Sequence, residues 1–200
     1  MTHRIRPVEE RDNDAIYDIC LRTADSGNDA THLYGDRRLP GHVWGGAYVA
    51  HQPEHAYVLI DDDTPVGYVL GARDSRSFEA TLEREWWPPL RERYPTGVDR
   101  PAAADRVAVY LLHHPSLADE RFVGDYPSHL HIDLLPEAQG RGDGRRMIEH
   151  LLDSLTDAGS PGVHLGVSPR NERAIGFYRT VGFTQLLRDE HHVLFGRRLG

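Results

Sequence analysis

The chain has 200 residues, a length at which one domain with a single core is the simplest organisation. Its formal net charge of -8 argues against a general binder of nucleic acid or acidic membranes, because such proteins usually carry an excess of basic residues. All 23 of its Lys and Arg residues are Arg, so a Schiff-base lysine and a phosphate-binding P-loop lysine are excluded.

The sequence also indicates a compartment. Cys20 is the single cysteine, so no disulfide can form within the chain, and the charged start MTHRIRPVEERDND lacks the apolar core of a secretory signal. The longest unbroken apolar run, residues 107–112, is much shorter than the roughly 20 residues that span a bilayer. We therefore expect a cytoplasmic protein with no membrane span.

The first part of the chain predicts a strand, a helix and a hairpin. Residues 3–8 form a short strand, and apolar residues then recur at helical spacing in a helix that begins near Glu9. A loop over residues 26–42 leads into a short helix over 43–52. Residues 56–61 and 66–72, rich in β-branched and aromatic side chains, are separated by the turn signal DDTP and predict a hairpin.

The second part predicts further helices and three strands. Residues 78–95 form a helix broken at Pro88 and Pro89, and residues 103–114 favour a helix over a strand. A strand over 129–135 is followed by a glycine-rich loop and by a helix that stops at Gly159. Residues 163–167 predict a strand, Asn171 caps a helix that runs through Thr180, and HHVLFGRRL forms the last strand.

The glycine-rich loop QGRGDGRR, residues 139–146, joins a strand to a helix. Unpaired backbone N–H groups and the helix dipole favour an anion there, and glycines let phosphate oxygens approach the main chain. Arg141, Arg145 and Arg146 outweigh Asp143, which favours a polyanionic ligand in this acidic chain. The loop matches neither the Walker pattern nor the dinucleotide pattern GxGxxG. The alternative is that its glycines only form a tight turn.

A second motif, GVHLGVSPRNERAIGFYRTVGF, places Tyr178 on the helix that follows Asn171. A phenol with a pKa of about 10 can protonate a departing thiolate, whose conjugate acid has a pKa of about 8.5. Such a proton transfer is required when an acyl group leaves a thiol. The alternative is that Phe177 and Tyr178 are core aromatics of an amphipathic helix.

Together, QGRGDG after a strand ending LLP and NERAIGFYRTVGF at residues 171–183 resemble the acetyl-CoA-binding and C-terminal motifs of the GCN5-related N-acetyltransferases (GNAT). The resemblance implies an α/β fold with a strongly twisted mixed sheet flanked by helices. It implies one domain over residues 1–200, with an insertion-like helical segment at 75–125 before the cofactor-binding strand.

The C-terminal half is more similar to one branch of this family. PSHLHIDLL, NERAIGFYRTVGF and VLFGRRL resemble the acetyltransferase-like domain of O-GlcNAc hydrolases and its stand-alone bacterial relatives. The animal domain is regarded as a pseudo-acetyltransferase without a working cofactor loop, whereas this chain keeps Gln139, Gly142 and Gly144. The resemblance therefore implies an acetyl-CoA-dependent N-acetyltransferase. The alternative is an inactive CoA-binding or protein-interaction domain.

The resemblance also implies roles for particular positions. Leu134 and Leu135 would pair through their main chain with the pantetheine arm, and Asn171 would contact it. Tyr178 matches the general acid. The pyrophosphate would be held by the backbone of the loop, which consists of Gln139, Gly140, Arg141, Gly142, Asp143, Gly144 and Arg145.

A base must take a proton from the attacking amine, because an alkylamine with a pKa of about 10 is mostly protonated at neutral pH. Asp133 is the predicted base, whereas many relatives carry their base carboxylate where Ser128 lies. Strand alternation puts His129, His131 and Asp133 on one face and Ser128 on the other. Asp133 as a structural hydrogen-bonding residue is the alternative.

The predicted acceptor is a small-molecule or peptide amine, and the sequence does not choose between them. The irregular loop after the first helix and the segment 75–125 are expected to form its pocket, with Tyr34, Trp44, Tyr48, Trp86 and Trp87 as candidates. The 13 histidines show no known zinc-site spacing, so no metal is predicted. A homodimer is compatible with the sequence.

Overall fold

The computed structural model describes residues 3–200, which form a seven-stranded sheet in the order β1-β2-β3-β4-β5-β7-β6. Only the β4–β5 pair is parallel. The strands are β1 (Arg4–Pro7), β2 (Ala56–Asp61), β3 (Thr64–Ala72), β4 (Ser128–Leu134), β5 (Gly162–Val167), β6 (Thr184–Arg188) and β7 (Val193–Arg198). The predicted mixed α/β sheet is therefore confirmed.

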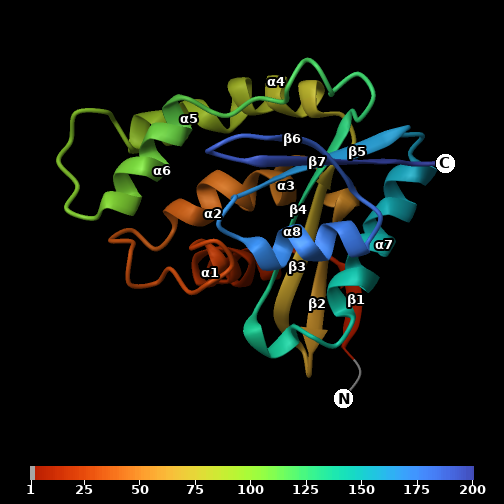
Figure 1. The fold of residues 1–200 in the computed structure, drawn as a ribbon. Coiled ribbons are helices and arrows are strands. Elements are labelled where there is room, and N and C mark those ends of the chain that lie inside the picture. The colour runs from red at the N-terminus through yellow and green to blue at the C-terminus, as the bar shows by residue number, and fades with distance from the viewer. Residues whose placement is uncertain (1–2) are drawn as a thin grey trace.

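Eight α-helices surround the sheet in the described part of the chain (Figure 1). They are α1 (Asn13–Thr23), α2 (Leu39–Trp44), α3 (Gly46–His51), α4 (Ser75–Glu85), α5 (Trp87–Arg93), α6 (Ala103–His113), α7 (Asp143–Asp157) and α8 (Glu172–Thr180). Short 3₁₀ helices cover Glu10–Asp12, Pro53–His55 and Pro136–Ala138. Within residues 3–200, no helix combines the length and the apolar composition needed to cross a bilayer.

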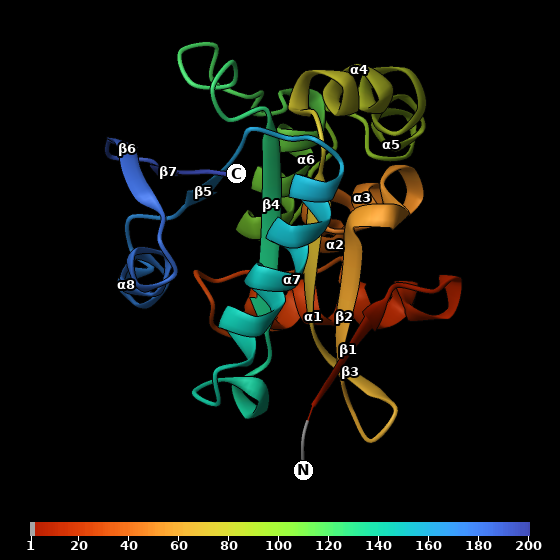
Figure 2. The same ribbon diagram turned by 90° about the vertical axis from the view of Figure 1, so that its right-hand side faces the viewer.

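The sheet divides between β4 and β5 into two arms. The first arm contains β1–β4, and the second contains β5, β6 and β7. β4 and β5 pair only at Ser128 with Val163 and at His129 with His164, and beyond that point they separate. Figure 2 shows β5, β6, β7 and α8 standing apart from the layer formed by β1–β4. Because the carboxyl ends of both strands point the same way, the separation opens a gap at the end where the glycine loop begins.

Three apolar clusters hold this arrangement together. α7 packs on one face of β2, β3 and β4 through Met147, Ile148 and Leu151, all of which are fully buried. α1 packs on the opposite face through Ile16 and Ile19. A third cluster joins α2, α4, α5 and α6 beside the sheet. Burial of each large aliphatic side chain contributes about 1.5–3 kcal/mol, so α1 and α7 fix the position of β4.

Three elements differ from the sequence-based expectation. The helix break lies at Trp86, and Pro88 and Pro89 belong to the first turn of α5, where a missing N–H costs no hydrogen bond. The helix predicted over 43–52 is two short helices that meet at Gly45. The strand β6 was not predicted, because its sequence TQLLR lies at a sheet edge and buries none of its residues fully.

The burial of His42 makes the free energy of unfolding depend on pH. His42 is buried on α2, where its Nδ1 lies 3.0 Å from the hydroxyl of Tyr17 and its Nε2 has no hydrogen-bond partner among residues 3–200. Burial, with a smaller contribution from the charges of Arg38 and Arg93, lowers the pKa of His42 to about 4. The folded protein therefore binds this proton less readily than the unfolded chain does.

We expect the free energy of unfolding to fall as the pH drops from about 6.5 to about 4, because the unfolded state takes up the proton first. Above pH 6.5 the contribution is fully present, and within the window it declines by about 1.4 kcal/mol per pH unit. Urea unfolding of a His42→Gln variant should show a shallower decline, whereas the exposed His32→Gln control should not. Equal slopes in both variants would contradict this assignment.

Candidate active site

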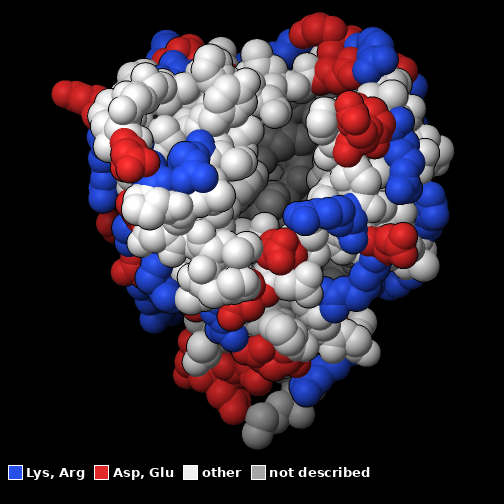
Figure 3. All heavy atoms as spheres, turned by 60° about the vertical axis from the view of Figure 1, so that its left-hand side comes forward, with Lys and Arg blue, Asp and Glu red and all other residues white. Residues whose placement is uncertain are grey.

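A cleft of about 1250 Å³ lies where β4 and β5 separate. Its walls come from the end of β4, the glycine loop, one side of α8, the loop after α1 and one side of α6. Figure 3 shows the molecule hollowed on this side, with arginine and acidic side chains on the rim of the hollow. Segments that are far apart in the sequence therefore share one cavity.

The main chain of β4 supplies polar groups to this cleft. In the antiparallel β3–β4 ladder the amide of Leu135 donates to the carbonyl of Val66, so every second residue counted back from Leu135 faces β3. Ile132 and Leu134 are out of phase with that set, and their N–H and C=O groups point to the side that β5 has left. Both residues line the cleft.

The predicted main-chain role of Leu135 does not fit this register. Its N–H is bonded to Val66, its C=O accepts from Ala138, and its side chain is buried in the cluster around α1. Ile132 takes its place as the second residue whose main chain is open to the cleft. Of the two expected residues, Leu134 faces the cleft and Leu135 faces β3. The sequence alone could not show this, because it does not show which strand pairs with β4.

The glycine loop presents a row of free amides. Gly140 and Gly142 have φ angles of 77° and 85°, in the left-handed region, and a Cβ at either position would meet nothing within 4 Å. In residues 3–200, no protein group accepts a hydrogen bond from the amides of residues 141–145. These amides begin α7, whose dipole adds partial positive charge. The loop therefore has the geometry of an anion site.

Side chains brace this loop from two directions. The amide nitrogen of Gln139 donates to the carbonyl of Leu134 at 2.7 Å, and its oxygen accepts from Arg173 of α8. Gly144 lies so close to Phe177 that a Cβ at this position would be 3.3 Å from the ring. Gln139 thus holds the start of the loop, and α8 packs closely on its end.

Of the three loop arginines that were expected to supply positive charge to the ligand, only one lies in the cleft. Arg145 lines the cleft, whereas Arg141 does not. Arg146 bonds to Asp143 and to the carbonyl of His3, on the side away from the cavity. The missing charge comes from the segment before and at the start of α8, where Arg170 and Arg173 line the cleft. The run PRNER shows in the sequence that two arginines lie close together, but not that they face the cleft.

Asp143 has a structural contact rather than an exposed side chain. Its carboxylate is buried at the first residue of α7 and lies 2.7 Å from Nδ1 of His3, next to β1. It does not line the cleft. The side chain therefore ties the start of α7 to β1, and only the backbone of Asp143 belongs to the row of amides.

Tyr178 lies on α8 with its ring in the core and its hydroxyl at the cleft. The ring contacts Phe177, Phe183 and Phe195. Burial first, and then the negative charge of Asp133, raise the pKa of Tyr178, so the phenol keeps its proton at neutral pH. The ring thus packs in the core, as one of the two interpretations expected, and the general-acid role of the hydroxyl stays a prediction. Asn171 caps α8 by accepting from the amide of Ala174 and also lines the cleft.

Asp133 is the end of a hydrogen-bonded chain that enters the cleft. One of its oxygens, Oδ2, accepts from the hydroxyl of Tyr68 at 2.6 Å and lies 3.0 Å from Nε2 of His131. The Tyr68 hydroxyl is in turn 3.0 Å from Sγ of Cys20. Burial first, and then the charge of Asp133, raise the pKa of Tyr68 and of Cys20, so both remain protonated. No motif in the sequence indicates that Cys20 and Tyr68 lie next to Asp133.

The alternative base position, Ser128, lies elsewhere. Its hydroxyl is buried, donates to the carbonyl of Arg73 and lies 2.7 Å from the hydroxyl of Ser160. Asp133 and His131 line the cleft on the opposite face of β4, as strand alternation predicted. Of the candidate acceptor aromatics, Tyr34 and Trp44 line the cleft, whereas Tyr48, Trp86 and Trp87 pack in the cluster beside the sheet.

Within residues 3–200, no group of three or more His, Cys, Asp or Glu side chains is placed to hold a metal ion. His129, which shares a strand face with His131, packs against Tyr48 and Phe78 instead.

The fold and this cleft agree with the family to which the chain is similar. The acetyltransferase (GNAT) family matches residues 23–183, which is most of the chain, and the chain therefore belongs to that family. A protein O-GlcNAcase of Rattus norvegicus is 26% identical over 208 residues, covering 98% of this chain but only 22% of the relative. The chain thus spans about a fifth of that relative's length, as the 22% coverage shows.

Solved structures show the same fold. The crystal structure of SsHAT has a TM-score of 0.90 and 38% identity, covering 99% of this chain and 98% of the other. The structure of yncA, a putative acetyltransferase from Salmonella typhimurium with its cofactor acetyl-CoA, has a TM-score of 0.57 and 16% identity, covering 100% of this chain and 95% of the other. At that identity the second likeness concerns the fold alone.

The contact between Asp143 and His3 gives a test of the structural role of the Asp143 side chain. We expect Asp143→Ala to lower the free energy of unfolding by about 1–3 kcal/mol, because it leaves buried donors without their acceptor. Asp153→Ala, an exposed position on the same helix, is the matched control and should change it by less than about 0.5 kcal/mol. Urea unfolding measures both, and equal values would refute the structural role.

Proposed function

We propose that this protein is an acetyl-CoA-dependent N-acetyltransferase that transfers the acetyl group directly to an amine. The observation that supports it most is the row of unpaired amides at residues 141–145, beside two glycines whose missing side chains leave open space in the cleft. A pyrophosphate fits such a row, because it can accept several backbone hydrogen bonds at the positive end of a helix. Arg145, Arg170 and Arg173 add the matching charge.

The open edge of β4 suits the arm that follows the pyrophosphate. The main-chain groups of Ile132 and Leu134 point into the gap, so an extended chain with amide groups can pair with them as a short strand would. The carbonyl of Leu134 is partly engaged by Gln139. Acetyl-CoA supplies an activated acyl group as a thioester, and the residues of this chain would position it and move the protons.

Asp133 and Tyr178 would carry the proton transfers. The network around Asp133 provides the negative charge that removal of a proton from the amine requires. Tyr178, protonated because it is buried, would donate to the departing sulfur. Both residues line the same cleft, so one cofactor and one acceptor could reach them together.

The acceptor would enter beside α1 and α6. This end of the cleft is lined by Leu33, Tyr34, Trp44 and Val107, and Asp25 adds a carboxylate. Apolar and aromatic walls with an acidic group suit an amine that carries an apolar substituent, whether on a small molecule or on a peptide. The alternative of an inactive domain has less support, since the loop amides are free and the cleft is open.

Cofactor binding can be tested by calorimetric titration with acetyl-CoA, with ATP and NAD as control ligands. We expect binding to wild type and its loss in Gly142→Glu, because the new side chain would fill the space beside the loop amides. Gly159→Glu is a matched control, since Gly159 also has a positive φ and open space but lies at the other end of α7, outside the cleft. Binding of acetyl-CoA to Gly142→Glu at wild-type affinity would contradict the proposed pyrophosphate site.

The acid role of Tyr178 predicts a specific kinetic defect. Tyr178→Phe keeps the ring in the core and removes only the hydroxyl, so we expect kcat to fall about 100-fold or more with little change in stability. Tyr110→Phe, an exposed position outside the cleft, should keep full turnover. The measurement is steady-state release of CoA thiol with an amine acceptor, and full turnover by Tyr178→Phe would reject the role.

A further inference from the structure

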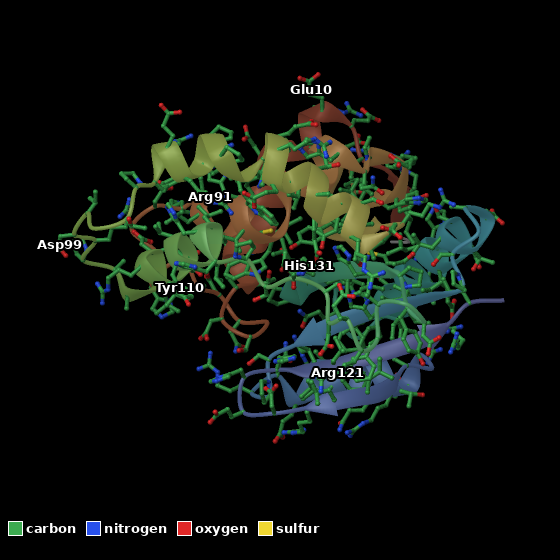
Figure 4. The ribbon with its side chains drawn as sticks, turned by 90° about the horizontal axis from the view of Figure 1, so that it is seen from above. Glu10, Arg91, Asp99, Tyr110, Arg121 and His131 are labelled. Atoms are coloured by element: carbon green, nitrogen blue, oxygen red, sulfur yellow. The ribbon has the colours of Figure 1, made fainter. Side chains whose placement is uncertain are left out.

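His131 is a residue of the cleft for which the sequence predicted no role. It lies on β4 and lines the cleft, and its imidazole stacks on Tyr68 with ring centroids 5.7 Å apart and an interplanar angle of 23°. In Figure 4 it lies near the centre of the molecule, between the helices α4–α6 and the strands β5–β7. The ring is thus held by a neighbour while one edge faces the cavity.

The hydrogen bonds around Asp133 determine which nitrogen of His131 carries the proton. Asp133 accepts from the Tyr68 hydroxyl, and a carboxylate has no proton to give, so the contact at 3.0 Å requires an N–H on Nε2 of His131. In neutral imidazole the other nitrogen, Nδ1, then has a free lone pair. Within residues 3–200 no protein group bonds to Nδ1, and it is not among the atoms closed off from solvent.

We propose that His131 Nδ1 is the atom that takes the proton from the acceptor amine, with Asp133 as the residue that orients the imidazole and stabilises its charged form. This inference rests on the proposed acetyltransferase function. It assigns the base step to a histidine–aspartate pair instead of to Asp133 alone. The sequence pattern HLHID contains both residues two positions apart on one strand face.

Chemistry favours the imidazole over the carboxylate as the first proton acceptor. A free carboxyl titrates at a pH of about 4 and a free imidazole at about 6.5, and a general base works best when it titrates near the operating pH. The Oδ2 atom of Asp133 already accepts two hydrogen bonds, whereas Nδ1 of His131 has no partner among residues 3–200. The same two bonds fix the position of Asp133, which is what an orienting group needs.

The surroundings of His131 contain few charges that compete with Asp133. Burial keeps Tyr68 of β3, Cys20 of α1 and Tyr178 of α8 protonated and neutral, because it raises the pKa of each. On β4, burial lowers the pKa of His129 to about 3, so that ring is neutral as well. Asp133 is the acidic side chain in contact with His131, so its carboxylate can stabilise an imidazolium there.

The step balances without any further reagent. The acceptor nitrogen forms a bond to the acetyl carbonyl carbon and loses one proton to Nδ1 of His131, while the carbon–sulfur bond breaks. The sulfur takes a proton from the Tyr178 hydroxyl. The imidazolium then returns its proton to the phenolate through water in the cleft, so an amine and a thioester become an amide and a thiol. Nothing is oxidised or reduced.

The first arm of the test is chemical rescue. CoA thiol release is measured with the best acceptor from a panel of small primary amines and short peptides, after calorimetry has shown that each variant binds acetyl-CoA. We expect His131→Ala to lower kcat/KM about 100-fold or more and added imidazole to restore part of it. His32→Ala, which changes an exposed histidine that does not line the cleft, should retain activity. Rescue would not follow from a merely structural role.

The second arm needs no acceptor and observes the nitrogen atoms directly. Nitrogen-15 NMR of histidine-labelled protein should show the neutral His131 ring with its proton on Nε2. A proton on Nδ1, or undiminished turnover by His131→Ala, would overturn the base role while leaving the acetyltransferase function intact. Absence of acetyl-CoA binding, or of turnover with every amine by wild type, would instead overturn the proposed function and the base role with it.

Discussion

The separation of β4 from β5 is the constraint on which the site depends. Two parallel strands that stayed paired would use up their own N–H and C=O groups, whereas here pairing stops after His129. The N–H and C=O groups of Ile132 and the N–H of Leu134 are thereby left facing a cavity, while the carbonyl of Leu134 accepts from Gln139. Backbone groups that are not paired within a protein must find another partner, and in this position that partner can be a ligand.

This opening is kept in place by packing on either side of β4. α7 and α1 clamp opposite faces of the first arm, while α8 packs with β5, β6 and β7 in the second. The glycine loop bridges the arms, because Gln139 bonds to β4 on one side and to Arg173 of α8 on the other. A loop held at both ends loses less conformational freedom when a ligand binds, so its amides are already in place.

The polar chain from Cys20 through Tyr68 to Asp133 and His131 shows how the core and the cleft are connected. Its inner members are buried and satisfied by one another, and its outer members face the cavity. A buried hydroxyl with a single correct partner fixes the orientation of that partner. The rigidity of the core around α1 is thus transmitted to the groups proposed to move protons.

The sequence by itself determined the family, the order of most strands and helices, and the strand face that carries His131 and Asp133, because these follow from local motifs and from the two-residue period of a strand. It also indicated the glycine loop and Tyr178, whose chemistry is carried by their own residue types. Only the tertiary structure decided that Ile132 replaces Leu135 at the open edge, that Asp143 turns towards His3, and that Arg170 and Arg173 supply the charge in the cleft. Pairing partners and contacts between distant segments depend on how the strands and helices pack together, and no local pattern in the chain records that.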